Sequence, residues 1–293
     1  MAVLPQLIAS AIILGGIYAL VSIGLTLVFG VMRIVNFAHG EFLMLAMYLA
    51  VGLFATTGID PYLGLLIAVP ASLAFGSVVY FGVIRPVVAR PHVVQIFTTL
   101  GLSIVLQNAA LFLWTGNFRQ LRLPYAEKVL SFAGAAVTVP QIVAFTVAAG
   151  FTVALFVWLR FTYLGKAMRA TAQDRGAATL MGIDTGKVLL AAFLVGTLCV
   201  TVAGMLMAPL FATYPTVGLQ FVLIAFVVVV LGGLGSAIGA LLGGMIVAFI
   251  DVGGGYYVGT AWKEALYFVV FIAVLLVRPA GLFGQRGAEH LGA

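Results

Sequence analysis

The sequence predicts an all-α polytopic membrane protein with about eight or nine transmembrane helices, some of them discontinuous or re-entrant. Of its 293 residues 64% are hydrophobic and only 8% are charged, whereas a soluble domain carries about 25% charged residues. The apolar runs are continuous, as in "LLIAVPASLAFGSVVYFGVI". Strands of a membrane β-barrel would instead alternate apolar and polar residues, so the sequence indicates helical spans.

The apolar runs divide the chain into nine candidate crossings, each near the roughly 20 residues that a helix needs to span a bilayer. A small-residue turn, "GGLGSAIG", divides the long run 216–257 into two passes. None of the polar segments is long enough for a separate soluble domain, so residues 1–293 are expected to form one membrane domain. The expected spans are 6–30, 38–57, 62–84, 93–115, 140–160, 188–208, 216–234, 237–257 and 262–277.

The distribution of basic residues predicts the orientation of these spans. Cytoplasmic loops carry an excess of Lys and Arg, and an outside N-terminus places ten of the 14 Lys and Arg residues inside. The net charge of +6 therefore reflects orientation and gives no reason to expect nucleic-acid binding. The inside residues are Arg33, Arg85, Arg90, Arg160, Lys166, Arg169, Arg175, Lys187, Arg278 and Arg286.

Small residues recur along one face of the first span, at Gly15, Ala19, Ser22, Thr26 and Gly30. A second set follows late in the chain, at Gly235, Gly239 and Gly243. Small residues permit close helix packing in lipid, and the alternative is that these seams slide during gating. Glycine and proline interruptions also mark discontinuous helices that line substrate paths.

The stretch "MRIVNFAHGEFLML" (32–45) gathers four polar residues between two spans: Arg33, Asn36, His39 and Glu41. Ionisable residues are costly in a bilayer, so they lie at an interface, pair with one another or face water. Asn36 is a good N-cap for a helix that starts at Phe37. The cluster is either a capped interfacial turn or a helix start that lines a transport path.

Thr99, Ser103 and Gln107 are spaced four residues apart in the fourth span and therefore share one helix face. They are expected either to form hydrogen bonds between helices or to line the path. No metal site is expected, because the chain has three His and one Cys and lacks an H-E-x-x-H motif.

The inner segment 161–187 is the least membrane-like part of the inner side. Its many alanines predict a short helix over about 167–181, which Gly182 would end. The segment is either a docking helix for a cytoplasmic partner or an ordinary connector. The chain has no P-loop and no G-x-S-x-G elbow, so no catalytic residue is expected.

Several motifs, in order, resemble the permease subunits of branched-chain amino-acid ABC importers. The resemblance covers nearly the whole chain and extends to the family's coupling loop, where Gln173 and Asp174 occupy the neighbourhood in which many importers carry a Glu. The stretches that carry it are "GGIYALVSIGLTLVFG" (15–30), "VNFAHGE" (35–41), "RPVVARPH" (85–92), "AQDRGAATLMGID" (172–184), "VVVVLGGLGSAIGALLGG" (227–244) and "LLVRPAGLFG" (275–284).

This resemblance implies a multi-pass subunit of the bacterial inner membrane that moves branched-chain or related amino acids inward. It implies a second permease, two ATPase subunits that hold ATP and Mg²⁺, and a periplasmic binding protein, with no cofactor in this chain. Permeases of the same family for urea, amides or aromatic acids are the alternative, and a stand-alone secondary carrier is a weaker one.

The residues expected at the path or gate are Asn36, His39, Glu41, Thr99, Ser103, Gln107 and, at a second helix break over 232–236, Gly232, Gly233 and Gly235. Those expected to couple to the ATPase are Ala170, Gln173, Asp174, Ala177, Ala178 and Gly182.

Overall fold

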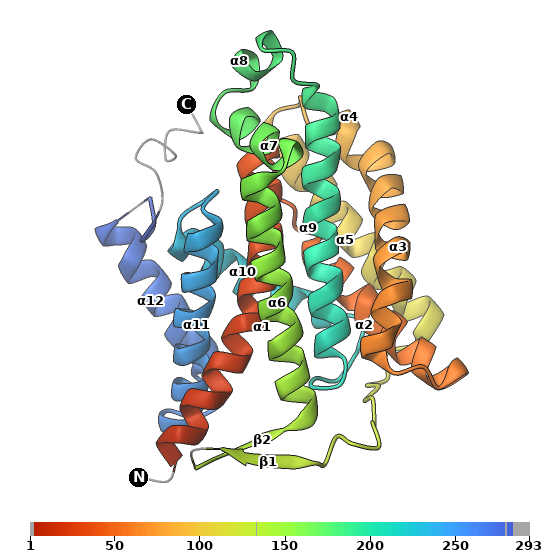
Figure 1. Ribbon diagram of the computed structural model, residues 1–293, viewed down its shortest axis with the longest axis vertical. Helices are drawn as coiled ribbons and strands as arrows, with labels where there is room; N and C mark the ends of the chain where they lie inside the picture. The colour runs from red at the N-terminus through yellow and green to blue at the C-terminus, as the bar shows by residue number, and fades with distance from the viewer. Residues whose placement is uncertain (1–2, 133, 279, 284–293) are drawn as a thin grey trace.

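The computed structural model describes residues 3–132, 134–278 and 280–283, which form a bundle of long helices (Figure 1). The π-helical turn η1 (Tyr80–Ile84) joins α3 to α4. The elements are α1 (Val3–Met32), α2 (His39–Thr57), α3 (Pro61–Val79), α4 (Arg85–Val87), α5 (His92–Trp114), β1 (Val129–Phe132), β2 (Ala135–Thr138), α6 (Val139–Phe161), α7 (Tyr163–Gln173), α8 (Arg175–Leu180), α9 (Thr185–Met207), α10 (Val217–Gly232), α11 (Ala237–Tyr257) and α12 (Lys263–Val277).

The helical membrane fold is confirmed. Within the described residues, 7 helices are long and apolar enough to cross a membrane: α1, α2, the continuous stretch Pro61–Val87, α5, α6, α9 and α11. The shorter helices α10 and α12, of 16 and 15 residues, occupy the two remaining expected spans. The expected count of eight or nine crossings therefore depends on these two helices.

The two polar segments lie at opposite ends of the bundle (Figure 1). The antiparallel β1–β2 hairpin lies beside the start of α1, where the side-chain amide of Gln6 donates to the carbonyl oxygen of Ala136 at 3.0 Å. Helices α7 and α8 lie at the other end. This arrangement agrees with the opposite sides predicted for 116–139 and 161–187; Arg286 lies outside the described residues.

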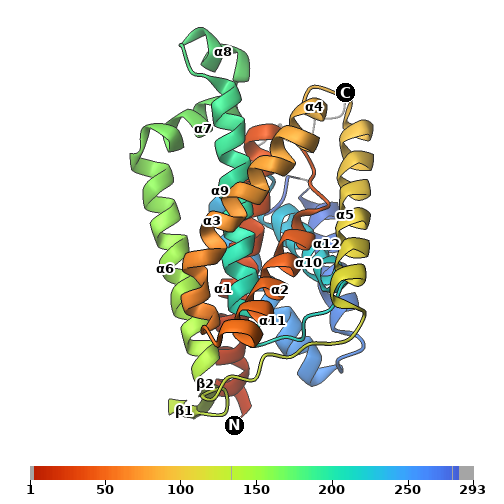
Figure 2. The same ribbon diagram turned by 90° about the vertical axis from the view of Figure 1, so that its right-hand side faces the viewer.

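Helices α1 and α9 form the centre of the bundle, and α5 and α6 lie at opposite edges (Figure 2). The central pair touches backbone to backbone at Gly24 and Gly196. A Cβ atom on Gly24 would lie 2.8 Å from the carbonyl oxygen of Gly196, and one on Gly196 would lie 2.9 Å from that of Gly24. Only glycine permits this approach, which sets the crossing of the two helices.

The small-residue sets lie in helix-packing contacts. Gly244 of α11 is so close to α1 that a Cβ atom there would lie 2.7 Å from the backbone nitrogen of Ala19. Gly30 lies against Gly235 in the turn between α10 and α11. Gly239 and Gly243 instead face α10, so the second set closes the α10–α11 hairpin.

Candidate functional site at two helix starts

Helix α2 begins in the interior of the bundle, alongside the middle of α1. The imidazole Nε2 of His39 lies 3.1 Å from the carbonyl oxygen of Val21, well inside α1. The chain leaves α1 after Met32 through Arg33, whose φ of 59° is rarely adopted by residues other than glycine. It then runs back along α1 to the point where α2 starts.

Helix α10 begins at the same place. A Cβ atom on Gly218 would lie 2.6 Å from the carbonyl oxygen of Gly40, and one on Gly40 would overlap the carbonyl oxygen of Gly218. The second helix break that meets residues 33–41 is therefore 208–216, between α9 and α10. The segment between α5 and β1 holds this break, since the backbone N–H of Arg119 donates to the carbonyl oxygen of Thr213 at 2.9 Å and the reverse bond measures 2.8 Å.

Glu41 lies between the two helix starts and is fully buried. Its Oε1 accepts hydrogen bonds from Ser103 Oγ at 3.0 Å and from Gln107 Nε2 at 2.8 Å. Its Oε2 has no hydrogen-bond partner among the described residues and faces Gly218. Gly218 lies in the first turn of α10, where the positive end of the helix dipole favours a carboxylate.

Other polar atoms surround the break. The hydroxyl of Thr99 donates to the carbonyl oxygen of Val35 at 3.1 Å, and Asn36 Oδ1 accepts the backbone N–H of Ala38 at 3.1 Å. Asn36 Nδ2 and His39 Nδ1 are buried and lack a partner in the part of the chain that the structure describes. The site therefore holds both donors and acceptors with unused hydrogen-bonding capacity.

The structure joins Glu41, Ser103 and Gln107 through hydrogen bonds, with Thr99 and Asn36 bonded to the adjoining break. The ring of His39 instead turns toward α1, where it lies beside Val21 and Gly24. The structure does not bring the 232–236 turn to this cluster, because Gly235 packs against Gly30 near the C-terminal end of α1. Gly232 ends α10 and Gly233 follows with a φ of 104°, so these glycines shape the α10–α11 turn. The expectation of a helix starting at Phe37 is wrong by two residues, since α2 starts at His39.

The single helix expected over 167–181 is wrong in detail, because Asp174 divides it into α7 and α8. Asp174 adopts an extended conformation and its Oδ1 accepts the backbone N–H of Ala177 at 2.9 Å, so it caps α8. Gly182 has a φ of 80°, the left-handed conformation that ends a helix. Asp therefore breaks a run that alanine content alone would continue.

The tip of this segment exposes an apolar surface that the sequence reasoning missed. Leu180 and Met181 are 89% and 82% exposed, whereas Ala178 is buried against the rest of the chain. Ala177 and Gln173 are exposed and Ala170 is half-buried. The available signal was an adjacent Leu–Met pair within an otherwise small and polar connector.

One hydrogen bond joins this segment to the helix break. Arg33 Nη2 donates to the carbonyl oxygen of Ala172 in α7 at 3.0 Å. Within the described residues, no group of three or more His, Cys, Asp or Glu is placed to hold a metal ion.

Two helix starts that meet inside a membrane bundle, with buried polar groups around them, are typical of membrane transporters. Comparison with known families is in agreement. Residues 7–275 match the family described as branched-chain amino acid transport system / permease component, and the chain belongs to this family. A permease component is one part of a transport system.

Individual relatives cover almost the whole chain. The chain is 32% identical over 301 residues to the Escherichia coli high-affinity branched-chain amino acid transport system permease protein LivH, covering 98% of this chain and 97% of the relative. It is 31% identical to the Pseudomonas aeruginosa permease BraD over the same shares, and 26% identical to a probable LivH of Methanocaldococcus jannaschii over 95% and 92% of the two chains. No solved structure matches the chain.

The contact between the two helix starts predicts different effects for two glycines of α2. Gly40→Ala is expected to destabilise the protein by about 1–3 kcal/mol, because its methyl group overlaps the backbone of α10. Gly52→Ala is the matched control, since nothing lies within 4 Å of its Cβ position, and it should be neutral or slightly stabilising. Thermal unfolding of the purified chain in detergent measures both, and equal midpoints would contradict the contact.

Proposed function

We propose that this chain is the membrane permease subunit of a binding-protein-dependent ABC importer that moves branched-chain or related amino acids inward. The similarity to LivH and BraD over 98% of the chain is the observation that carries the proposal. Together with a second permease, two ATPase subunits and a periplasmic binding protein, it would form the transporter. Its place would be the bacterial inner membrane.

The meeting point of α2 and α10 is the proposed path or gate. A carboxyl group buried among membrane helices is costly, so its presence there points to a function. Glu41, held by Ser103 and Gln107 beside Gly218, offers a negative group to the ammonium of an amino acid. Asn36 and His39, with their spare polar atoms, are placed to take part in the same passage.

Coupling to ATP hydrolysis is proposed to run through α7 and α8. In this scheme the exposed Leu180 and Met181 enter a groove on the ATPase, and Asp174 and Gly182 fix the angle of α8. ATP and Mg²⁺ remain on the ATPase subunits, with no cofactor in this chain. The hydrogen bond from Arg33 to Ala172 then transmits a movement of α7 to the helix break.

Two adjacent residues of α5 test the path. Gln107→Leu removes a hydrogen bond to Glu41. We expect ATP-driven leucine uptake, measured in proteoliposomes of the assembled transporter, to fall about tenfold, because this is the effect of losing one hydrogen bond to a charged group. Asn108→Leu is the control, because Asn108 is exposed and its side chain donates to the carbonyl oxygen of Ile104 in its own helix.

Equal uptake by the Gln107→Leu and Asn108→Leu transporters would show that the polar residues around Glu41 have only a structural role. If the wild-type transporter moved urea or acetamide but not leucine, the proposed substrate class would be wrong and the permease assignment would still hold.

The docking surface makes a separate prediction. Leu180→Glu places a charge on a surface that must be desolvated in the ATPase groove, so co-purification of the ATPase and its stimulated hydrolysis should both fall by about tenfold or more. Val129→Glu makes a similar change at an exposed residue at the opposite end of the bundle and should have no effect. If the Leu180→Glu variant bound the ATPase fully, the α7–α8 segment would be only a connector between spans.

A further inference from the structure

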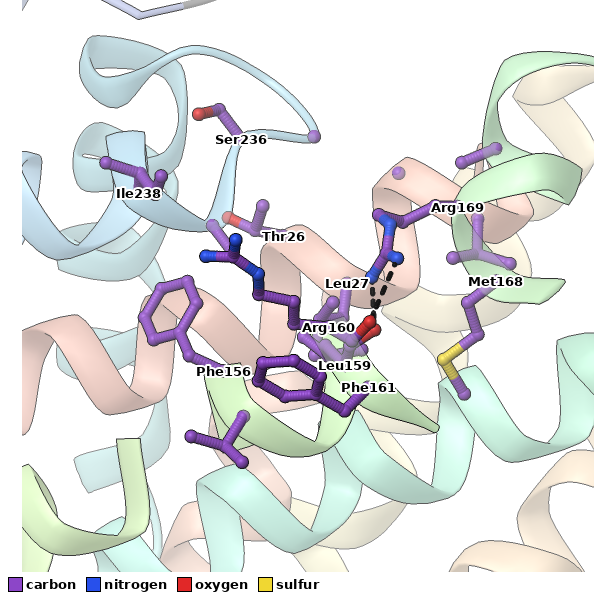
Figure 3. A pocket seen from close by; sticks show the side chains of 16 residues that line it. Thr26, Leu27, Phe156, Leu159, Arg160, Phe161, Met168, Arg169, Ser236 and Ile238 are labelled. Carbon is purple, nitrogen blue, oxygen red and sulfur yellow. Dashed lines mark hydrogen bonds between the residues drawn. The ribbon is translucent and has the colours of Figure 1, made fainter. Parts of the chain in front are cut away.

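A cavity of about 640 Å³ opens where α1, α6, α7 and the α10–α11 turn approach one another. Figure 3 shows the lining side chains, which come from all four elements. The cavity lies away from Glu41, which does not line it, and toward the α7–α8 end of the bundle. Its lining includes Thr26, Leu27, Phe156, Arg160, Arg169 and Ile238.

The mouth of this cavity is positively charged. Arg160 comes from the last turn of α6 and Arg169 from α7, and none of the described residues that line the cavity is acidic. Arg169 donates to the carbonyl oxygens of Leu159 and Arg160, which holds its guanidinium in place at the end of α6. The α11 N-terminus, which begins at Ala237, adds the positive end of a helix dipole on the opposite side.

The cavity also contains an unused polar group. The hydroxyl of Thr26 is almost completely buried and has no hydrogen-bond partner within the described ranges of the chain. A buried hydroxyl without a partner is costly. Since Thr26 lines the cavity, an acceptor bound there would satisfy it.

The walls below the arginines are apolar and belong to membrane-spanning helices. Phe156 and Val157 of α6, Leu27 of α1 and Ile238 of α11 all contribute apolar side chains to the lining. Val157 and Ile238 remain 52% and 61% exposed, so this apolar surface is open to the bilayer. A soluble anion would match the arginines and leave these walls uncovered.

We propose that this cavity binds one anionic phospholipid of the leaflet on the α7–α8 side, which the charge distribution assigns to the cytoplasm. Its phosphate lies between Arg160, Arg169 and the α11 N-terminus, and an acyl chain covers Phe156 and Val157. Basic pockets between membrane helices on this side are suited to anionic headgroups. The lipid ties α6 and α7 to the α10–α11 turn, independently of which solute the protein moves.

Lipid binding by the purified full-length chain tests this inference, with adducts counted by native mass spectrometry in detergent containing dioleoyl-phosphatidylglycerol or dioleoyl-phosphatidylcholine. We expect a specific phosphatidylglycerol adduct whose affinity falls about fivefold in Arg160→Gln, the change expected for one basic residue near an anionic headgroup. Arg160→Lys should retain most of it.

Arg85→Gln is the matched control. Each of the two arginines lies over the ring of a neighbouring phenylalanine: the Arg85 guanidinium is 5.7 Å from the ring centre of Phe81, and the Arg160 guanidinium is 5.6 Å from that of Phe161. Only Arg160 of this pair lines the cavity. The proposal would be overturned if both Gln variants lost the same affinity for phosphatidylglycerol or if the chain bound the two lipids equally. Displacement of phosphatidylglycerol by millimolar inorganic phosphate would also overturn it. So would a Val157→Cys disulfide between two copies of the chain, because a second copy would then cover the cavity.

Discussion

The backbone contact between Gly40 and Gly218 is the constraint on which the site depends. It requires α2 and α10 to begin inside the bundle, and a side chain at either position would push the two helix starts apart. The positive ends of two helix dipoles therefore converge on one small region. Glu41 is the acidic side chain at this point, and the α10 start and the donors of α5 help to offset the cost of burying it.

The rest of the bundle holds these two helix starts in place. The contact between Gly24 and Gly196 is reciprocal, as is that between Gly40 and Gly218, so one glycine pair fixes α1 to α9 and another fixes α2 to α10. Arg119, in the segment between α5 and β1, pairs with Thr213, and Arg33 is bonded to Ala172 of α7. Each helix break is thus fixed to a segment at one end of the bundle.

Much of this fold could be predicted because apolar run length and residue type are local properties. The expected span 237–257 coincides with α11, and the polar residues of 36–41 and 99–107 were both identified. Their meeting at Glu41 could not be predicted, since it depends on how α5 packs beside α2. The second break was placed at 232–236 because glycines there signal a turn, whereas 208–216 looked like an ordinary end of a span.

The inner segment shows the same limit at a smaller scale. Alanine content favours a continuous helix, but Asp174 caps a new one, because an Asp side chain competes for backbone N–H groups. The exposure of Leu180 and the burial of Ala178 follow from that break. A helix drawn through 174 would turn different side chains outward.

If solute passes the meeting point of α2 and α10, the region around Glu41 must become accessible to water during transport. The most direct measurement is the reactivity of Ser103→Cys with a water-soluble cationic thiosulfonate in the assembled transporter, with and without ATP, beside Ile104→Cys on the exposed side of the same helix. The native Cys199 is fully buried and should contribute little. The account predicts that the Ser103→Cys thiol reacts in at least one nucleotide state and that uptake is then lost, while the Ile104→Cys thiol does not react. A Ser103→Cys thiol that stays unreactive in every state would contradict the account.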